Sequence, residues 1–155
     1  MKSIYNINDI KLVVQKVSQA RCVVEGKVTG EIGTGYMLLV GFGHEDTRET
    51  ARKYARKIAR LRIFEDENGK INRSIFDVGG SILSISQFTL YGDARKGNRP
   101  GFTAALGGPQ AIELYDYFNE CLREEGLKVE TGIFGAMMSI SLTNEGPITI
   151  ILDNL

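Results

Sequence analysis

The sequence predicts an α+β fold: an antiparallel β-barrel-like sheet with two main helices in a single domain. Short runs of β-branched and aliphatic residues, separated by glycine-containing turns, occupy the first quarter of the chain and return at its end. Two intervening segments repeat their apolar residues at helical spacing. The 155 residues, 43% of them hydrophobic, can bury one core, and no repeat or linker divides them.

The first third of the chain has the pattern of a meander that leads into a helix. Residues 1–10 form an N-terminal extension, and the domain spans residues 11–155. Strands are expected at residues 12–17, 21–24, 27–32 and 36–40, with turns at 25–26 and 33–35. Asp46 and Glu49 have the spacing of a capping box, which predicts a helix that runs to about Arg62.

Arginines gather on one side of this helix. Arg48, Arg52, Arg56 and Arg60 are each four residues apart, so they share a face. A solvated basic face is the favoured interpretation, and a surface that touches nucleic-acid phosphates is the alternative. The whole chain has 19 basic and 19 acidic residues, so its net charge does not favour a nucleic-acid partner.

A glycine-rich basic loop is expected at residues 92–102. It carries Arg95, Lys96 and Arg99, which suit phosphate, and its glycines permit close approach to a ligand. The sequence favours a ligand-binding loop and a plain surface loop about equally. The middle of the chain is expected to form a strand at 61–64, a tight turn at 68–69 and a buried strand at 82–85. A second helix should begin at Pro109 and end at Gly126. A strand at 127–131 and a last hairpin with its corner at Gly146-Pro147 should follow.

Composition narrows the class of protein. No apolar run reaches about 18 residues and the N-terminus lacks the apolar core of a signal peptide, so we expect no membrane span and a cytoplasmic protein. Cys22 and Cys121 are far apart and His44 is the single histidine, which predicts neither a disulfide framework nor a metal site, and no cofactor. Both cysteines are expected to be buried, and His44 to be an exposed structural residue.

Two polar stretches beside strands are candidates for chemistry. Ser86, Gln87 and Thr89 put two hydroxyls and an amide directly after an apolar strand, where they satisfy local backbone groups or face a ligand. The second stretch contains Gly146-Pro147 between two apolar alternations. A plain hairpin turn is its simplest interpretation, and a cis peptide bond is plausible there.

Together the two stretches resemble the signature motifs of the D-aminoacyl-tRNA deacylases, with Ser-Gln-Phe-Thr at 86–89 and Asn-Glu-Gly-Pro-Ile-Thr at 144–149. The resemblance covers nearly the whole chain through blocks in the family's order: 13–17, 30–33, 61–64, 77–80, 87–91 and 128–132. It implies hydrolysis of the ester bond of D-aminoacyl-tRNA, and of mischarged glycyl-tRNA, which releases the free amino acid and the tRNA.

The resemblance also implies a homodimer in which Gly146-Pro147, joined by a cis peptide bond, enters the partner subunit's active site and excludes L-residues sterically. Phe88, Phe134 and Met138 would pack around the terminal adenosine of the aminoacyl-tRNA. Each also suits plain core, and for Met138 the two interpretations are nearly equal. The ribose 2′-hydroxyl of that adenosine would help to deliver the water.

The residues themselves support ester hydrolysis without a strong base. The sequence has no Gly-x-Ser-x-Gly elbow, no P-loop and no triad set around its histidine. An aminoacyl ester is already activated, so a positioned water and donors to the oxyanion supply much of the rate. Amides around Ser86, Gln87 and Phe88 are the candidate oxyanion hole. Thr89 orients water or acts as a nucleophile, and orientation is favoured because no base adjoins it.

Lys16 departs from the family, which usually has an arginine that braces the Gly-Pro carbonyl. Lysine lacks the planar guanidinium fork, so the bracing is expected to be weaker. Relatives with a trans Gly-Pro lose chiral strictness and clear L-alanine from mischarged tRNA, and this relaxed editing is the alternative enzyme. A non-enzymatic nucleic-acid-binding module that uses the arginine helix is the third hypothesis.

Overall fold

The structure is a computed structural model that describes residues 9–155. Its strands are β1 (Lys11–Val24), β2 (Lys27–Ile32), β3 (Gly35–Gly41), β4 (Phe64–Glu65), β5 (Ile71–Arg73), β6 (Ser81–Ser86), β7 (Val129–Thr131) and β8 (Ser139–Leu152). Its helices are α1 (Arg48–Arg60), α2 (Gly108–Glu124) and the short 3-10 helix η1 (Phe88–Tyr91). Residues 1–8 of the expected extension lie outside the described residues.

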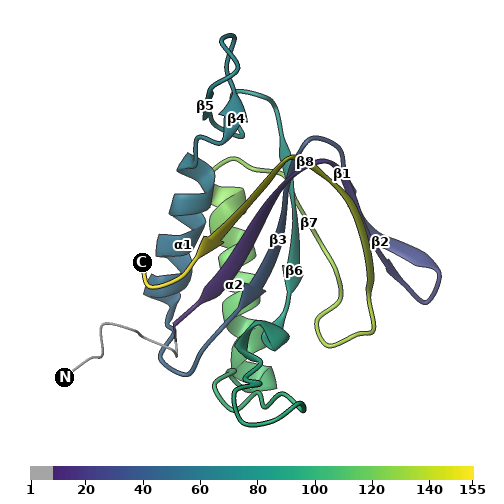
Figure 1. Ribbon diagram of the computed structural model, residues 1–155, viewed down its shortest axis with the longest axis vertical. Coiled ribbons are helices and arrows are strands. Elements are labelled where there is room, and N and C mark those ends of the chain that lie inside the picture. The colour runs from purple at the N-terminus through teal and green to yellow at the C-terminus, as the bar shows by residue number, and fades with distance from the viewer. Residues whose placement is uncertain (1–8) are drawn as a thin grey trace.

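The main sheet has the strand order β2-β1-β3-β6-β7, and β8 also pairs with β1. β1 is antiparallel to β2, β3 and β8, whereas β6 is parallel to β3 and to β7. Parallel neighbours need long crossovers, which the segments containing α1 and α2 provide. The predicted class is confirmed as a single domain with two main helices and a barrel-like sheet, although the sheet is mixed rather than purely antiparallel (Figure 1).

β1 and β8 bend over together (Figure 1), and Gly146-Pro147 lies between the two ladders that join them. Residues 12–15 pair with residues 149–152, and residues 19–23 pair with residues 139–143. Between these ladders, residues 145–148 bulge out of β8 opposite Lys16. The expected hairpin with its corner at Gly146-Pro147 is therefore wrong, because both arms pair with β1 instead of with each other.

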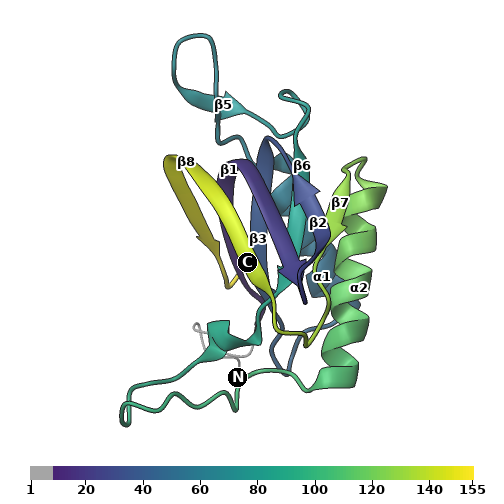
Figure 2. The same ribbon diagram turned by 90° about the vertical axis from the view of Figure 1, so that its right-hand side faces the viewer.

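The sheet separates two apolar cores because successive strand residues point to opposite faces. In β3, Tyr36 and Leu38 belong to the core against the helices, whereas Met37 belongs to the opposite core. Tyr54, Ile58, Phe118 and Leu122 are among the large helix residues of the first core. Figure 2 shows both helices on one side of the sheet. On the other side, the bent strands close over a smaller core that contains Cys22 and Ile85.

The capping box of α1 is formed by other residues than expected. The N–H of Thr50 donates to Thr47 Oγ1 at 3.4 Å, and the N–H of Thr47 donates to Thr50 Oγ1 at 2.9 Å. Asp46 and Glu49 therefore do not form the box. Asp46 accepts backbone N–H groups before the helix instead, because its carboxylate is half-buried there.

Other local signals act largely as predicted. The buried stripe of α1 is Ala51, Tyr54, Ala55, Ile58 and Ala59. Pro109 lies in the first turn of α2, and Gly126 follows its end with a φ of 102°. The strand expected at 61–64 is largely wrong, because only Phe64 of these residues lies in a strand, β4. Cys22 and Cys121 are buried free thiols, as expected. Within residues 9–155, no helix is long and apolar enough to cross a membrane.

Candidate active site

The polar stretch 86–89 lies at the edge where three parallel strands end. Ser86 is the last residue of β6 and pairs with Val40 near the end of β3. The N–H of Gln87 donates to the Val40 carbonyl oxygen at 2.8 Å, after which the chain leaves the sheet as η1. β7 ends at the same edge with Thr131, because the carboxyl ends of parallel strands lie together.

Gly41 allows η1 to pack directly on β3. A Cβ atom at this position would lie 2.9 Å from Cε2 of Tyr91 and 3.0 Å from the carbonyl oxygen of Gln87. Tyr91 is buried there, and its hydroxyl donates to the Gly41 carbonyl at 3.3 Å and to the Asp9 carbonyl. The backbone of the site is therefore held against the sheet by close packing and by a buried phenol.

Gln87 and Thr89 are linked by a hydrogen bond from Gln87 Nε2 to Thr89 Oγ1. Because the threonine oxygen accepts from the amide, its own O–H remains a donor for a ligand or water. The N–H of Gln87 is used by the sheet, which removes it from the expected oxyanion hole. The N–H groups of Ser86 and Phe88 remain candidates. Phe88 begins a 3-10 helix, where no preceding turn supplies a carbonyl acceptor for its N–H.

Phe88 presents an aromatic surface beside these polar groups. Its side chain is 56% exposed, and its ring meets that of Phe102 edge to face with centroids 5.2 Å apart. A large exposed aromatic ring costs solvation unless a ligand covers it, and a nucleobase is a suitable cover. Phe102 contacts the ring, and more than half of the Phe88 side chain stays exposed.

Phe134 approaches the same edge through Tyr115. The Phe134 and Tyr115 ring centroids are 6.1 Å apart, and the Tyr115 hydroxyl donates to the Ser84 carbonyl on β6 at 2.7 Å. Phe134, Tyr115 and the buried Asn119 line a hollow of about 260 Å³ between α2 and the end of β7. Met138, in contrast, packs half-buried against the second core, so its contacts are those of a core residue.

Gly146-Pro147 is not brought to this edge within the chain. Both residues are exposed, their peptide bond is cis, and the Asn144 Nδ2 group closes the bulge by donating to the Ile148 carbonyl at 3.1 Å. The bulge lies opposite Lys16, which pairs with Tyr36, whereas Ser86 pairs with Val40. Four strand residues correspond to about 13 Å, so the bulge and the polar stretch lie level with opposite ends of β3.

Lys16 does not brace the bulge as the expected arginine would. Its Nζ lies over the Phe64 ring, 5.5 Å from the centroid, on the helix side of the sheet. Within residues 9–155 it makes no hydrogen bond to Gly146 or Pro147. A compact ammonium on this stem is satisfied by the aromatic face of Phe64, which is stacked on Tyr36.

The arginine face of α1 contacts acidic residues of α2 and the residue that caps its C-terminus, Glu125. Arg48 pairs with Glu113 at 3.4 Å, Arg52 with Glu124 at 3.4 Å, and Arg56 and Arg60 with Glu125 at 4.0 and 3.4 Å. Arg52 also donates to the Tyr117 hydroxyl at 2.7 Å. These carboxylates offset the positive charge that phosphates would need. The arginine row therefore joins the two helices. The predicted solvated face is exposed, but its arginines also form ion pairs that the prediction did not include.

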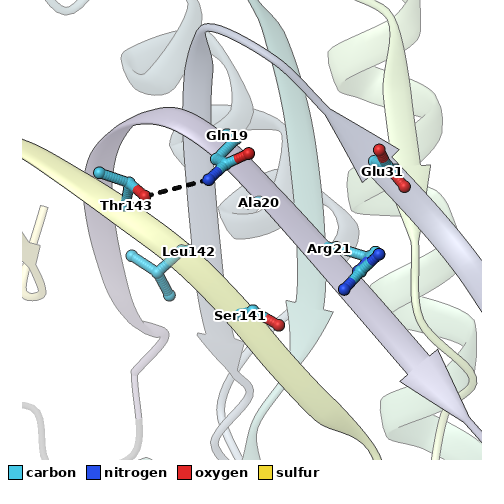
Figure 3. A pocket seen from close by; sticks show the side chains of 7 residues that line it. All are labelled: Gln19, Ala20, Arg21, Glu31, Ser141, Leu142 and Thr143. Atoms are coloured by element: carbon cyan, nitrogen blue, oxygen red, sulfur yellow. Dashed lines mark hydrogen bonds between the residues drawn. The ribbon is translucent and has the colours of Figure 1, made fainter.

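A separate hollow of about 200 Å³ lies between the outer arms of β1 and β8, away from the polar stretch (Figure 3). It is lined by Gln19, Ala20, Arg21, Glu31, Ser141, Leu142 and Thr143, with a hydrogen bond from Gln19 Nε2 to Thr143 Oγ1 at 3.3 Å. It contains no aromatic ring and no buried polar residue, so it lacks the features that the strand edge combines.

The sequence did not single out three residues that shape the site. Gly41 and Tyr115 looked like ordinary strand-end and core residues, and their roles depend on contacts between distant segments. Phe102 closes the basic loop, and its signal was an aromatic residue directly after three cations and a glycine-rich run. His44 lies outside the polar stretch, where its Nε2 donates to the Thr103 carbonyl at 2.7 Å; it is exposed, as expected.

The sheet edge brings together an exposed aromatic ring, a side-chain amide and two hydroxyls, a combination that suits a ligand with a nucleobase. Comparisons with known proteins specify the class of protein. The model of the D-Tyr-tRNA(Tyr) deacylase family matches residues 13–153. The chain belongs to the D-aminoacyl-tRNA deacylase family, as its motifs predicted.

Individual relatives support this membership. A D-aminoacyl-tRNA deacylase of Bacillus velezensis is 60% identical over 145 residues, which cover 94% of this chain and 99% of the relative. One from Thermus aquaticus is 55% identical and covers 94% of this chain and 95% of its own. Among solved structures, a c-Myc DNA unwinding element binding protein is 41% identical, with a TM-score of 0.85, 92% of this chain and 97% of that chain covered.

Proposed function

We propose that this protein hydrolyses the ester bond of D-aminoacyl-tRNA, and of mischarged glycyl-tRNA, to release the free amino acid and the tRNA. The observation that carries the proposal is the hydrogen bond between Gln87 and Thr89 beside the exposed ring of Phe88. It holds one hydroxyl donor next to a surface for the terminal base. The names of the relatives agree with the substrate.

In the proposed reaction, Phe88 stacks on the terminal adenosine and Phe134 borders it from the α2 side. The Thr89 hydroxyl orients a water molecule, and the Phe88 N–H donates to the oxygen that becomes negative. Water adds to the ester carbonyl carbon, and the bond from that carbon to the ribose oxygen breaks. The ribose oxygen takes the proton that the water loses, with the 2′-hydroxyl as a relay. Ser86 and Gln87 position these groups.

Chiral selection is proposed to come from a second copy of the chain. Gly146-Pro147 is exposed and lies level with the opposite end of β3 from Ser86. A homodimer related by a two-fold axis would place each Gly-Pro bulge in the other subunit's site. Its backbone carbonyls would then occupy the space of an L side chain, so that D-residues and glycine pass. The proposed location is the cytoplasm, where charged tRNA is made.

The contact of Lys16 favours one alternative activity. Its ammonium lies over Phe64 instead of at the Gly-Pro carbonyl, so the bulge lacks a brace that would hold it rigidly. A looser filter would admit a small L side chain, which is the relaxed editing of L-alanyl-tRNA. The paired arginines of α1 argue against the binding module that would use them.

The test compares amino-acid release from four tRNA esters, D-tyrosyl, L-tyrosyl, glycyl and L-alanyl, at low enzyme concentration. Release of D-tyrosine and glycine with retention of L-tyrosine and L-alanine is the expected result. Release of L-alanine together with D-tyrosine would favour relaxed editing. Binding of tRNA without release from any ester would remove both enzymatic functions.

A further inference from the structure

The loop between η1 and α2 contains a closed finger at the edge of the candidate active site. The N–H of Asp93 donates to the Gly101 carbonyl at 2.8 Å, and the N–H of Gly101 donates to the Asp93 carbonyl at 2.9 Å. These bonds close a neck from which residues 94–100 project, as the long loop below the sheet in Figures 1 and 2 shows. Gly92, which begins the loop, directly follows η1.

The returning limb of the finger is attached to both the site and the sheet. Phe102 follows the neck, and the centroid of its ring lies 5.2 Å from that of the Phe88 ring. Farther along, the Thr103 carbonyl accepts from His44 Nε2 at 2.7 Å, and the N–H of Leu106 donates to the Phe42 carbonyl at 2.9 Å. The finger is therefore oriented with respect to the ring proposed to hold the terminal base.

Some charged side chains of the finger have an ion-pair partner and others do not. Asp93 binds Arg95 in two bonds, from Nε to Oδ1 at 2.9 Å and from Nη2 to Oδ2 at 2.8 Å, and this arginine holds the pKa of the Asp93 carboxyl well below its usual range. Lys96 and Arg99 are exposed and form no ion pair within the described part of the chain. Because Asp93 is balanced by Arg95, Lys96 and Arg99 leave the finger with a net positive charge of two, whereas the arginines of α1 have acidic partners.

We propose that Lys96 and Arg99 bind backbone phosphates near the 3′ end of the aminoacyl-tRNA while Phe88 holds its terminal base. This rests on the proposed function. The finger tip is at most four residues from the neck, about 14 Å in extended chain, so it reaches phosphates a few nucleotides from the terminal base. Phosphates are the same whatever the amino acid, so these contacts add affinity without affecting the choice between D- and L-residues.

The test uses a double variant of the full chain, Lys96→Ala with Arg99→Ala, and a matched control, Lys53→Ala with Lys57→Ala, which removes the same charge from the exposed side of α1. The probe is an acceptor-stem RNA hairpin that carries no amino acid and ends in a single-stranded 3′ terminus. Its binding is measured by fluorescence anisotropy over a series of salt concentrations. The finger variant should bind at least about tenfold more weakly, and its slope of log K against log salt should fall by about 1.4 to 2.

Hydrolysis gives a second measurement. The KM of the finger variant for D-tyrosyl-tRNA should rise about tenfold, whereas its rate on D-tyrosyl-adenosine, which has no phosphate, should fall far less. The charge-conserving exchange Lys96→Arg with Arg99→Lys should recover most RNA binding. The α1 control should behave as the wild type in both assays.

Unchanged RNA binding in the finger variant, or an equal loss in the α1 control, would overturn the inference. So would equal losses on the tRNA ester and on the adenosine ester, because the finger would then act on the site itself. Finger-dependent RNA binding without hydrolysis of any ester would support the phosphate site while removing the proposed deacylase activity. Hydrolysis of D-tyrosyl-tRNA by the wild type, together with normal RNA binding by the finger variant, would support the deacylase activity and remove the phosphate site.

Discussion

Gln87 donates a hydrogen bond from Nε2 to Oγ1 of Thr89, two residues farther along the chain. Gln87 is itself attached to the sheet, since its N–H donates to the Val40 carbonyl at 2.8 Å. The threonine hydroxyl is thus positioned by a residue whose backbone belongs to the rigid part of the fold. Its proton points away from the amide and is available for water or substrate.

Replacement of Thr89 by valine should lower kcat for D-tyrosyl-tRNA by about a hundredfold with a small change in KM, because the shape remains and the water-orienting donor is lost. Stability should change by no more than about 0.5 kcal/mol, since the side chain is exposed. Release of D-tyrosine measures the first effect and urea unfolding the second. Thr34→Val, in the exposed turn before β3, is the control and should keep wild-type kinetics. A Thr89 variant with unchanged kcat would disprove the assigned role.

Gly41→Ala should destabilise the protein by about 1 to 3 kcal/mol, because the new methyl group would lie 2.9 Å from the Tyr91 ring and 3.0 Å from the Gln87 carbonyl. Relief of that contact must displace η1, so activity should fall as well. Urea unfolding and D-tyrosine release measure the two effects. At Gly33 a Cβ would meet only the Ser18 carbonyl oxygen at 3.9 Å, so Gly33→Ala is the matched control. Equal effects of the two substitutions would show that η1 does not depend on this close approach.

Gly146→Ala should lower the turnover of D-tyrosyl-tRNA and impair D/L discrimination. Gly146 has a φ of 115°, and a Cβ there would lie 2.8 Å from Ile148 Cγ1, so alanine must distort the bulge. The distance of the bulge from its own Ser86 permits a sharper experiment. Thr89→Val and Gly146→Ala chains, unfolded together and refolded, should form hybrid dimers.

Each hybrid dimer has one site with an intact Thr89 and an intact Gly146, because the two residues of a site would come from different subunits. Random mixing makes half of the dimers hybrid, so roughly a quarter of wild-type activity should return. Each variant refolded alone is the control. If the mixture were no more active than the average of the two variants, the bulge would not act across subunits.

Stability should depend on pH through Asp46, which lies before α1. Burial raises the pKa of its carboxyl to about 7, with a contribution from the neighbouring Asp9, and prevails over the hydrogen bonds from Gly43 and Thr50 that lower it. The folded chain therefore keeps a proton that the unfolded chain releases near pH 4. Stability from this group is fully present below about pH 4 and is lost as pH rises toward 7.

The free energy of unfolding of the wild type should consequently fall by on the order of 1 kcal/mol between pH 5 and pH 8, after allowance for solvent screening. The urea midpoint should decrease with it. Asp46→Asn cannot titrate, so its midpoint should be flatter over this range, whatever its absolute stability. The difference between the two slopes is the measurement. Parallel curves for the two proteins would assign the pH dependence to other groups.

Local chemistry was predictable from the sequence where neighbours along the chain decide the outcome. The buried stripe of α1, Pro109 at the start of α2, Gly126 after its end and the polar stretch after Ile85 were all predicted. Each depends on helical or strand periodicity, a fixed proline φ or a glycine at positive φ, which few residues determine. The family followed from the same stretches, because the motifs are themselves contiguous.

Tertiary structure decided what depends on pairing between distant segments. Gly146-Pro147 became a bulge and not a hairpin corner because both arms of β8 found partners on β1, where a longer ladder satisfies more backbone groups. The arginines of α1 became partners of α2 because Glu113, Glu124 and Glu125 lie across the helix interface. Lys16 contacts Phe64 because Phe64 stacks on Tyr36, the β3 residue that pairs with Lys16. Sequence spacing specifies none of these neighbours, since loop closure and packing select them only in the folded chain.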